Sequence, residues 1–533
     1  MLTVKGAQMK IKEILSGFAG RFKNTSKRFT VSLAMSLAFT LYFSYLIIFH
    51  NAGGESYQYN ILLALLAGCA VSLMIKVISE NVYKINEWIN AVVSVILSAG
   101  MYFWLEKSDN SLYSEMGFAA VGIIAVIAVM WCLYRNHDER KVFPYLVKSA
   151  IYCGILVSVR FLGIFVSLLA FNYLIVEIED LFDKIVPVLA VFLEFFLCYN
   201  LFISYLPQKD DEITSFKGYD LIVSKAGMYV YLLLIAILYG YIVKIIVTWS
   251  MPVGRLNWFG CIALLFFVFF YLNVNKDMGV VQKWFVNNCG FILIPVVAIQ
   301  LYAIYIRVNA YGLTTLRYAS LLLIAVALLF VLNSIIKKKM SWVFVPMAVI
   351  ALIGLVSPLN IIDLPDHDQE ARLKRVLEAN GMLNGNEIIN YGKEVSREDA
   401  EKICSGIAYF SYQTAGKRNE FRNNVSKLDR YVYDKDIMPY DDNREYYNCH
   451  LFDETISIEG YKTIEEGYMG SVEEEFMEFF KTFIKDDLDY QQTQETMTFD
   501  YDSNTRYVFK IIAITTVDGE IESVSCDYWL LKK

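Results

Sequence analysis

Histidine and proline are scarce in this chain of 533 residues, and charged residues are fewer than in soluble proteins. There are 4 histidines and 9 prolines, and Asp, Glu, Lys and Arg make up 19% of the chain, against roughly 25% in soluble proteins. So few histidines argue against a Ser-His-Asp triad and a histidine-based metal site. The apolar fraction of 56% and the mean hydropathy of +0.41 are typical of a multi-pass membrane protein with a polar appendage. This composition excludes a nucleic-acid binder, a secreted disulfide scaffold and a disordered chain.

The usual motifs of nucleotide-binding and hydrolase sites are missing as well. The chain has no Gly-x-x-x-x-Gly-Lys loop, no Gly-x-Gly-x-x-Gly, no Gly-x-Ser-x-Gly and no Cys-x-x-Cys. Six of the nine cysteines lie in or beside apolar runs, and the others, Cys404, Cys449 and Cys526, allow at most one internal disulfide. A segment with four candidate ligands could bind a cation, but a linker leading to a helix N-cap has the same pattern and is favoured (Asp363, Asp366, His367 and Asp368). We therefore assign no catalytic residue, metal or cofactor, and favour a function other than catalysis.

The net charge of −7 conceals two opposite halves. Residues 1–360 sum to +9 and residues 361–533 to −16. Apolar runs of membrane length end near Leu359, where a polar, tyrosine-rich sequence begins. We predict a basic cytoplasmic segment over residues 1–28, an all-α polytopic membrane domain over 29–360, and a small acidic α+β domain over 361–533.

Eleven apolar runs are long enough to cross a bilayer, which takes about 20 helical residues. None has the length and cleavage site of a signal peptide, so the first run is expected to remain as a helix. The predicted spans are 29–50, 59–78, 88–105, 116–134, 149–174, 185–206, 226–247, 256–272, 289–306, 316–335 and 342–359.

Lysine and arginine alternate between the connections. Residues 1–28 and every second connection together hold 21 of these cations, whereas the five other connections hold five. The positive-inside rule therefore predicts a cytoplasmic N-terminus, and an odd number of spans places residues 361–533 outside the cytoplasm. A miscount of one helix would reverse the second statement.

The polar region has the patterns of a mixed domain. Residues 366–380 and 397–413 are expected to form helices, the second opened by a capping box of Ser396 and Asp399. A third helix is expected to begin at Ser471. Residues 507–516 and 521–531 predict a β-hairpin, turned by Asp518-Gly519.

Two charges fall in the middle of consecutive spans. Arg160 lies in span 149–174 and Glu194 in span 185–206, at similar depth. A lone charge there costs a few kcal/mol or more, so we expect the two to pair. Such a pair serves equally well as an ion or proton relay and as a structural link between helices. Lys244, near the outer end of its span, is a secondary candidate that we expect to extend its ammonium group to the interface.

A second site is the turn between spans 289–306 and 316–335. Gly312 is expected to end one helix, and Thr314 to cap the next. Arg307 and Arg317, with Tyr311, could hold a phosphate or carboxylate beside the free N–H groups of the helix. Interfacial anchoring of two helix ends is the alternative, and we favour it.

These residues carry a family resemblance. The pattern Arg307…Tyr311-Gly312-Leu313-Thr314…Arg317-Tyr318 resembles a bacterial multi-pass family, domain-of-unknown-function family 4153. The stretches Ile237-Leu238-Tyr239-Gly240-Tyr241…Lys244-Ile245…Pro252, Arg372-Leu373…Leu377…Asn380-Gly381-Met382-Leu383 and Ser396…Asp399…Ile403 are similar to the same family. The resemblance spans roughly residues 145–410 and implies a protein of the bacterial cytoplasmic membrane. It brings no functional residues with it.

Three functions are compatible with these features. A transporter or permease is placed slightly ahead because of the many spans and the paired charges. The alternatives are an envelope sensor or scaffold whose outer domain binds a ligand or partner, and an outer-face enzyme acting on lipid phosphates or glycans. The expected partners are the lipid bilayer and an anionic small molecule or lipid headgroup, and no nucleic acid.

Overall fold

The chain forms two compact units in a computed structural model. One unit comprises residues 1–389 with 405–425, and the other comprises 390–404 with 426–533. The boundary expected at residue 360 concerns the edge of the membrane and stays a prediction. The structure describes residues 23–49, 56–107, 111–175, 180–213, 219–248, 255–274, 279–390, 393, 395–410, 419–428, 444–451, 461–469, 476–484, 491–517 and 520–533.

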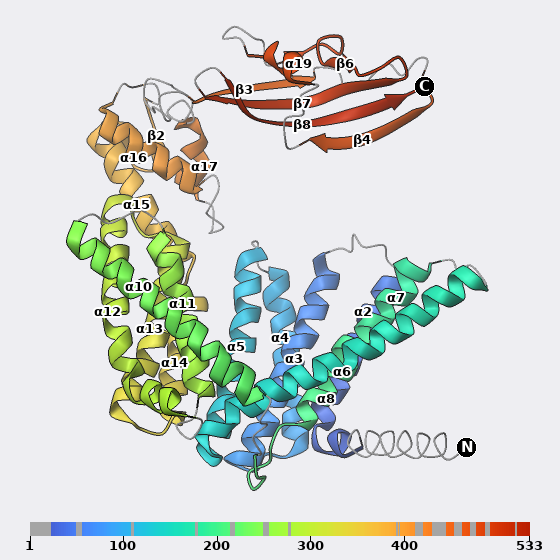
Figure 1. The fold of residues 1–533 in the computed structure, drawn as a ribbon, viewed down its shortest axis with the longest axis vertical. Helices are drawn as coiled ribbons and strands as arrows, with labels where there is room; N and C mark the ends of the chain where they lie inside the picture. The colour runs from blue at the N-terminus through green and yellow to red at the C-terminus, as the bar shows by residue number, and fades with distance from the viewer. Residues whose placement is uncertain are drawn as a thin grey trace. The chain divides into compact units, whose positions relative to one another are not determined.

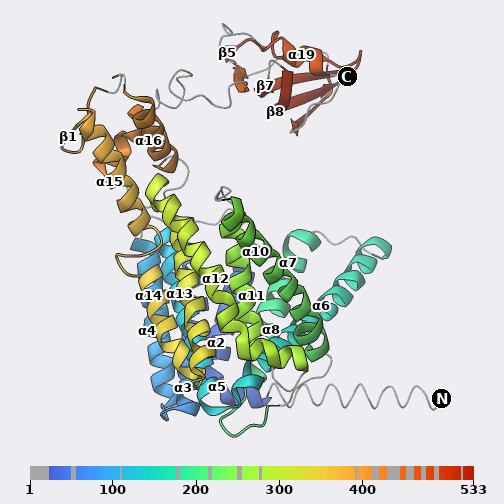
Figure 2. The same ribbon diagram turned by 60° about the vertical axis from the view of Figure 1, so that its left-hand side comes forward.

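The first unit is built from apolar helices that run side by side (Figures 1 and 2). Within the described residues, nine helical stretches are long and apolar enough to cross a membrane. They are α2 (Thr30–Phe49), α3 (Ser56–Asn81), α4 (Glu87–Lys107), α5 (Ser111–Asn136), α6 (Glu139–Leu174), the run of η1, α7, η2 and α8 (Leu181–Ser204), the run of η3 and α10 (Asp220–Thr248), α12 (Val280–Tyr311) and α13 (Thr315–Ile336).

Two further apolar helices are shorter. They are α11 (Arg255–Asn273) and α14 (Ser341–Leu355), and they coincide with the predicted spans 256–272 and 342–359. The 15 residues of α14 rise about 22 Å, less than the roughly 30 Å of a hydrocarbon core. A multi-pass helical bundle is therefore confirmed, and the count of eleven spans stays a prediction.

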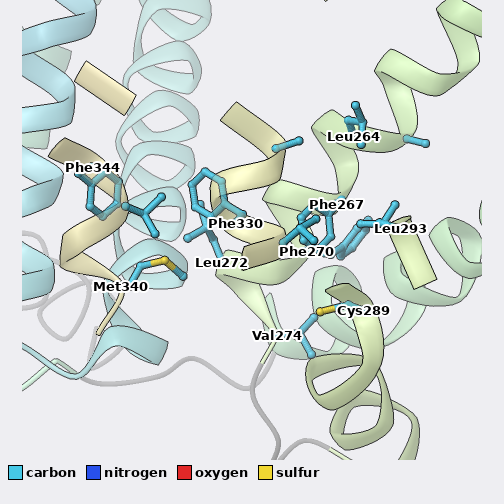
Figure 3. Close-up of a cluster of buried hydrophobic side chains, with 14 of the residues drawn as sticks. Leu264, Phe267, Phe270, Leu272, Val274, Cys289, Leu293, Phe330, Met340 and Phe344 are labelled. Carbon is cyan, nitrogen blue, oxygen red and sulfur yellow. The ribbon is translucent and has the colours of Figure 1, made fainter. Parts of the chain in front are cut away.

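One apolar core connects α11, α12, α13 and α14. Figure 3 shows Phe267, Leu293, Phe330 and Phe344 gathered from these four helices. Close approach of α12 and α13 depends on Gly290. A Cβ added there would lie 2.1 Å from Ser334 Oγ and 3.1 Å from the carbonyl oxygen of Val331. In lipid, no hydrophobic driving force brings helices together, so their association depends on van der Waals packing. Small residues such as glycine allow this close packing.

Beyond the apolar helices, the chain continues in short elements of the first unit. They include α15 (Asp363–Ala379), the two-residue strands β1 (Leu383–Asn384) and β2 (Glu387–Ile388), and α17 (Glu420–Asn424), followed by a 3₁₀ turn, η6 (Val425–Leu428). α16 (Arg397–Ala408) crosses the boundary between the units. The two predicted helices are confirmed as α15 and α16. The expected capping bond is present, since the Asp399 amide donates to Ser396 Oγ at 3.2 Å.

The second unit is a six-stranded sheet in the order β4-β8-β7-β3-β5, with β6 paired to β7. The predicted hairpin is confirmed as β7 and β8, but its turn, Asp518-Gly519, lies outside the described residues. α19 (Met477–Lys481) belongs to the third predicted helix, whose start at Ser471 also lies outside them. The strands are β3 (Arg444–Leu451), β4 (Thr463–Met469), β5 (Gln491–Gln492), β6 (Thr498–Asp500), β7 (Thr505–Val517) and β8 (Glu520–Lys532).

Phenylalanines hold α19 to the sheet. Phe476 and Phe480 are fully buried and pack with Phe509 and Ile512 of β7 in one core cluster. Cys404 and Cys526 are buried, and burial raises the pKa of Cys526 to about 12. The side chain of Cys449, the third cysteine of this region, lies outside the described residues.

Replacing Gly290 by alanine should destabilise the helix bundle, because the new methyl group has no room between α12 and α13. Overpacking of this kind costs about 1–3 kcal/mol. The matched control is Gly240→Ala in α10, where an added Cβ meets no atom within 4 Å. Thermal unfolding of the purified protein, followed by size-exclusion chromatography, should show a lower midpoint for Gly290→Ala alone. Equal midpoints would contradict the close approach.

Candidate functional site

The turn between α12 and α13 has the local structure that the sequence predicts. α12 ends at Gly312, which has a φ of +75°, and Thr314 is the N-cap residue of α13. The Thr314 hydroxyl makes no capping hydrogen bond. A Cβ at Gly312 would lie 2.5 Å from Gln369 Nε2 and 2.9 Å from Asp368 Oδ2, both of α15. Glycine is needed here for the positive φ and for the close approach of α15.

Three side chains of α15 bind the backbone of this turn. The Leu313 amide donates to Asp368 Oδ2 at 2.7 Å. Gln369 Nε2 donates to the carbonyl oxygens of Tyr311 and Leu313 at 2.9 and 3.0 Å. Arg372 donates to the carbonyl oxygens of residues 308, 309 and 310, the shortest bond being 2.8 Å to Ala310. We call residues 308–318 together with Asp368, Gln369 and Arg372 the junction.

The chemistry of a helix end explains this arrangement. The last carbonyl groups of α12 have no partner within the helix and carry the negative end of its dipole. The guanidinium of Arg372 supplies donors and a positive charge at that point, and the amide of Gln369 supplies two more bonds. Cations near a helix C-terminus stabilise it. The junction therefore supplies hydrogen-bond donors to the last carbonyl groups of α12.

Of the two arginines of the predicted anion site, Arg317 lies in the junction and Arg307 directly precedes it. Arg317 donates to the carbonyl oxygen of Gly312, and its guanidinium lies 5.8 Å from the centre of the Tyr311 ring. Arg307 is half-buried, and its charge and that of Arg372 both repel Arg317. The N–H group of Leu313, which an external anion could have bound, donates to the Asp368 carboxylate. Binding of an external phosphate or carboxylate here stays a prediction.

The opposite face of α15 carries an ion network that the sequence did not reveal. Asp366 is 1% exposed, and its Oδ2 accepts from Arg422 Nη1 at 3.0 Å. Glu370 Oε2 accepts from Arg422 Nε at 2.9 Å and from Asn419 at 2.9 Å. Lys374 lies 2.8 Å from the other oxygen of Glu370. A guanidinium shared by two buried carboxylates fixes α17 to α15.

Tyr409 connects this network to the first turn of α13. Its hydroxyl donates to Asp366 Oδ1 at 2.7 Å, and the Thr315 side chain interacts with it as well. Burial and the neighbouring charge of Asp366 raise the pKa of Tyr409, so the hydroxyl stays protonated and remains a donor. A continuous polar chain thus runs from Thr315 through Tyr409 and Asp366 to Arg422.

Only part of this ion network could have been predicted from the sequence. Asp366, Glu370 and Lys374 follow one another at four-residue spacing, which puts them on one face of a helix. That spacing could have marked the Glu370–Lys374 pair. Arg422 lies 52 residues after Glu370, and no local pattern joins the two.

The predicted intramembrane charges lie on two helical stretches, Arg160 on α6 and Glu194 in the Leu181–Ser204 run. Glu194 is exposed and accepts a hydrogen bond from Ser158 at 3.4 Å. Among the ion pairs between described residues there is none from Arg160 to Glu194, so their pairing stays a prediction. Glu194 lies in a π-helical segment, η2 (Val191–Leu197). Lys244 is exposed on α10.

The three carboxylates of the cation pattern have different partners, and the fourth residue, His367, is exposed. Asp363 accepts from the hydroxyl of Tyr113 and from Asn360, Asp366 from Arg422 and Asp368 from the Leu313 amide. No group of three or more His, Cys, Asp or Glu side chains within the described ranges could hold a metal ion. The carboxylates diverge because α15 turns between them.

These features define a multi-pass integral membrane protein with a structured polar segment fastened to its helices. The chain belongs to a family described as domain of unknown function DUF4153, whose model matches residues 34–401. The match begins well before residue 145, the position at which the motif resemblance begins. It includes the whole of α15. No curated protein and no solved structure matches the chain.

Loss of the Arg372 guanidinium should loosen the junction. In Arg372→Gln, the last carbonyl groups of α12 lose their charged donor, which costs about 1–3 kcal/mol. Arg375→Gln is the control, since among the described residues Arg375 donates to Ala371 of its own helix. Thermal unfolding in nanodiscs should show a lower midpoint for Arg372→Gln than for Arg375→Gln. The same midpoint for both would mean that the cap contributes nothing.

The ion network should make stability depend on pH. Burial alone would raise the pKa of Glu370, but hydrogen bonds from Lys374 and Asn419 and the charge of Arg422 hold it below the ordinary value of 4.5. A carboxyl with a lowered pKa stabilises the fold above its unfolded pKa, and this contribution is lost as the pH falls through the folded value. Glu370→Gln should therefore be less stable than wild type at pH 7, and the gap should narrow as the pH falls below 4.5. Unfolding midpoints between pH 7 and the acid limit measure the gap, and a constant gap would contradict the network.

Proposed function

We propose that this protein is a membrane-embedded sensor or scaffold, in which events in the polar region after α14 reach the membrane helices through α15. The junction is the observation that carries the proposal. A part that transmits movement needs a fixed connection to each element that it joins. α15 has two such connections, because one of its faces binds the α12–α13 turn and the other binds α17.

The contacts give the path of the proposed coupling. A shift of α17 displaces Arg422, which holds Asp366 and Glu370 on α15. Asp366 also binds Tyr409, which touches Thr315 at the start of α13. Interfaces packed in this way switch between discrete arrangements more readily than they deform gradually. A disturbance at Arg422 is therefore expected to change how α13 packs.

The sheet of the second unit supplies the binding part in this proposal. Its first strand, β3, begins 20 residues after the end of α17, and Tyr468 of β4 is 68% exposed. Beside it in the sheet, Lys510 and the indole of Trp529 both donate to Glu466. Tyrosine and tryptophan on a surface are enriched where proteins bind partners.

The orientation belongs to the same proposal. α2 begins at the end of the bundle where α3, α5 and α13 finish (Figures 1 and 2), so the basic connections gather on one side. The positive-inside rule supports a cytoplasmic location for that side and an extracytoplasmic one for α15. A bacterial cytoplasmic membrane is the expected site.

Cys261 offers a direct test, because its Sγ lies 3.5 Å from Ser320 Oγ of α13. In a full-length variant that keeps Cys261 as its only cysteine, Arg422→Leu should change the rate of maleimide labelling several-fold. Arg397→Leu is the control, since Arg397 is 70% exposed and pairs only with Glu401 along its helix. An unchanged labelling rate in Arg422→Leu, with the protein folded, would leave α15 as an anchor and not a relay.

Transport is the second candidate, and one observation favours it. Glu194 lies in the π-helical stretch η2, and such stretches occur often at functional sites. Cys198, one turn further on, reports whether water reaches this depth. Efficient labelling of Cys198 by a water-soluble maleimide in intact membranes would favour an aqueous pathway beside Glu194. Protection until denaturation would favour the sensor.

A further inference from the structure

We propose that the basic end of the bundle holds one anionic phospholipid, with an acyl chain in an apolar cavity and the headgroup in a neighbouring lysine-lined pocket. The proposal uses the orientation proposed above and does not depend on the sensor function. It rests on two hollows that lie next to each other along α3 and that differ sharply in chemistry.

The first hollow is an apolar cavity of about 390 Å³ between α2, α3, α5, α6 and the η2–α8 run. Leu66, Ala70 and Leu73 form its wall on α3, and Gly122 lines it from α5. A Cβ at Gly122 would meet no atom within 4 Å, so open space faces this glycine.

A lipid chain suits this cavity better than water does. Apolar cavities stay dry, and one of roughly 150 Å³ already admits benzene. The solvent around these helices is lipid, because they are the membrane-spanning elements of the chain. Among the components of a bilayer, an acyl chain has the chemistry to fill an apolar space between helices.

The second hollow has a volume of about 840 Å³, and polar and apolar groups share its lining. It is lined by the end of α3, the α3–α4 connection and Lys209. On α3 its wall begins at Lys76 and Glu80, which continue the stripe of Ala70 and Leu73 at three- and four-residue spacing. Residues so spaced share a face of the helix. On the other side, Leu206 lines the cavity and Lys209 lines the pocket. The two hollows are therefore consecutive along two segments.

The charges of the pocket leave a positive excess. Lys76 pairs with Glu87, and Glu80 pairs with Arg28 at 2.7 Å. The other two lysines, Lys84 and Lys209, are exposed and have no carboxylate within ion-pair distance among the residues that the structure describes. Their ammonium groups can therefore bind an anion.

Arg28 marks the border between the two hollows. Its guanidinium donates to the carbonyl oxygen of Leu206 at 2.6 Å while it pairs with Glu80. Basic pockets between membrane helices on the cytoplasmic side are suited to anionic lipid headgroups. One molecule that has a long apolar chain and a phosphate at its end fits both hollows, and this describes an anionic phospholipid.

Native mass spectrometry of the full-length protein tests the site, with phosphatidylglycerol and phosphatidylcholine of the same chain length as probes. We expect one retained phosphatidylglycerol per chain, and at least tenfold weaker retention of phosphatidylcholine. Lys84→Gln with Lys209→Gln should abolish the preference, because each lysine near a headgroup contributes about fivefold. Lys107→Gln, at the opposite end of α4, is the control and should have no effect.

Gly122→Leu tests the acyl chain separately, since its side chain would occupy the cavity. It should reduce retention of phosphatidylglycerol at least fivefold, whereas Gly100→Leu, an exposed glycine with equal free space, should not. If Gly122→Leu fails to fold, Ala70→Leu fills the same cavity from α3. Equal retention of the two lipids, displacement of the lipid by free phosphate alone, or full retention in the cavity-filling variant would each overturn the proposal.

Discussion

The end of α12 imposes the constraint on which the polar region depends. A helix that reaches the membrane surface leaves its last carbonyl groups without partners, and an uncompensated polar group at low dielectric costs several kcal/mol. The chain meets this need with α15, because Arg372 and Gln369 donate to those carbonyl oxygens and Asp368 accepts from the next free amide. Gly312 is part of the same solution, since only a residue without a side chain leaves room for α15. The helix end thus determines where the segment after the last apolar helix begins and how it is held.

The second face of α15 carries the buried carboxylates Asp366 and Glu370. A buried charge is tolerated only when it is paired and hydrogen-bonded, and Asp366 is almost completely buried. Arg422 donates to both Asp366 and Glu370, Tyr409 donates to the other oxygen of Asp366, and Lys374 pairs with the other oxygen of Glu370. Removing one member would strand the others, so the network specifies one arrangement of α15 and α17. A helix fixed on both faces in this way can carry a displacement, which is the physical basis of the proposed sensor.

The sequence predicted those features that local chemistry decides. Long apolar runs predicted the helices, Gly312 and Thr314 marked the turn, and alternating β-rich segments marked the β7–β8 hairpin. The network at Arg422 could not be predicted, because its partners are 52 and 56 residues away. Nor could the partner of the Leu313 amide: the motif suggested an external anion, but a carboxylate of the chain itself lies there. The same limit applies to Arg160 and Glu194, whose similar depth in two spans says nothing about which way their helices face.

The most direct test of this account is hydrogen–deuterium exchange at the Leu313 amide in the full-length protein in nanodiscs. The junction predicts slow exchange in the wild type and at least tenfold faster exchange in Asp368→Ala, because the carboxylate that holds the amide is gone. Glu378→Ala, which removes an exposed carboxylate from the same helix, should leave the rate unchanged. Fast exchange in the wild type, or the same slow rate in Asp368→Ala, would contradict the fixed connection between α15 and the membrane helices.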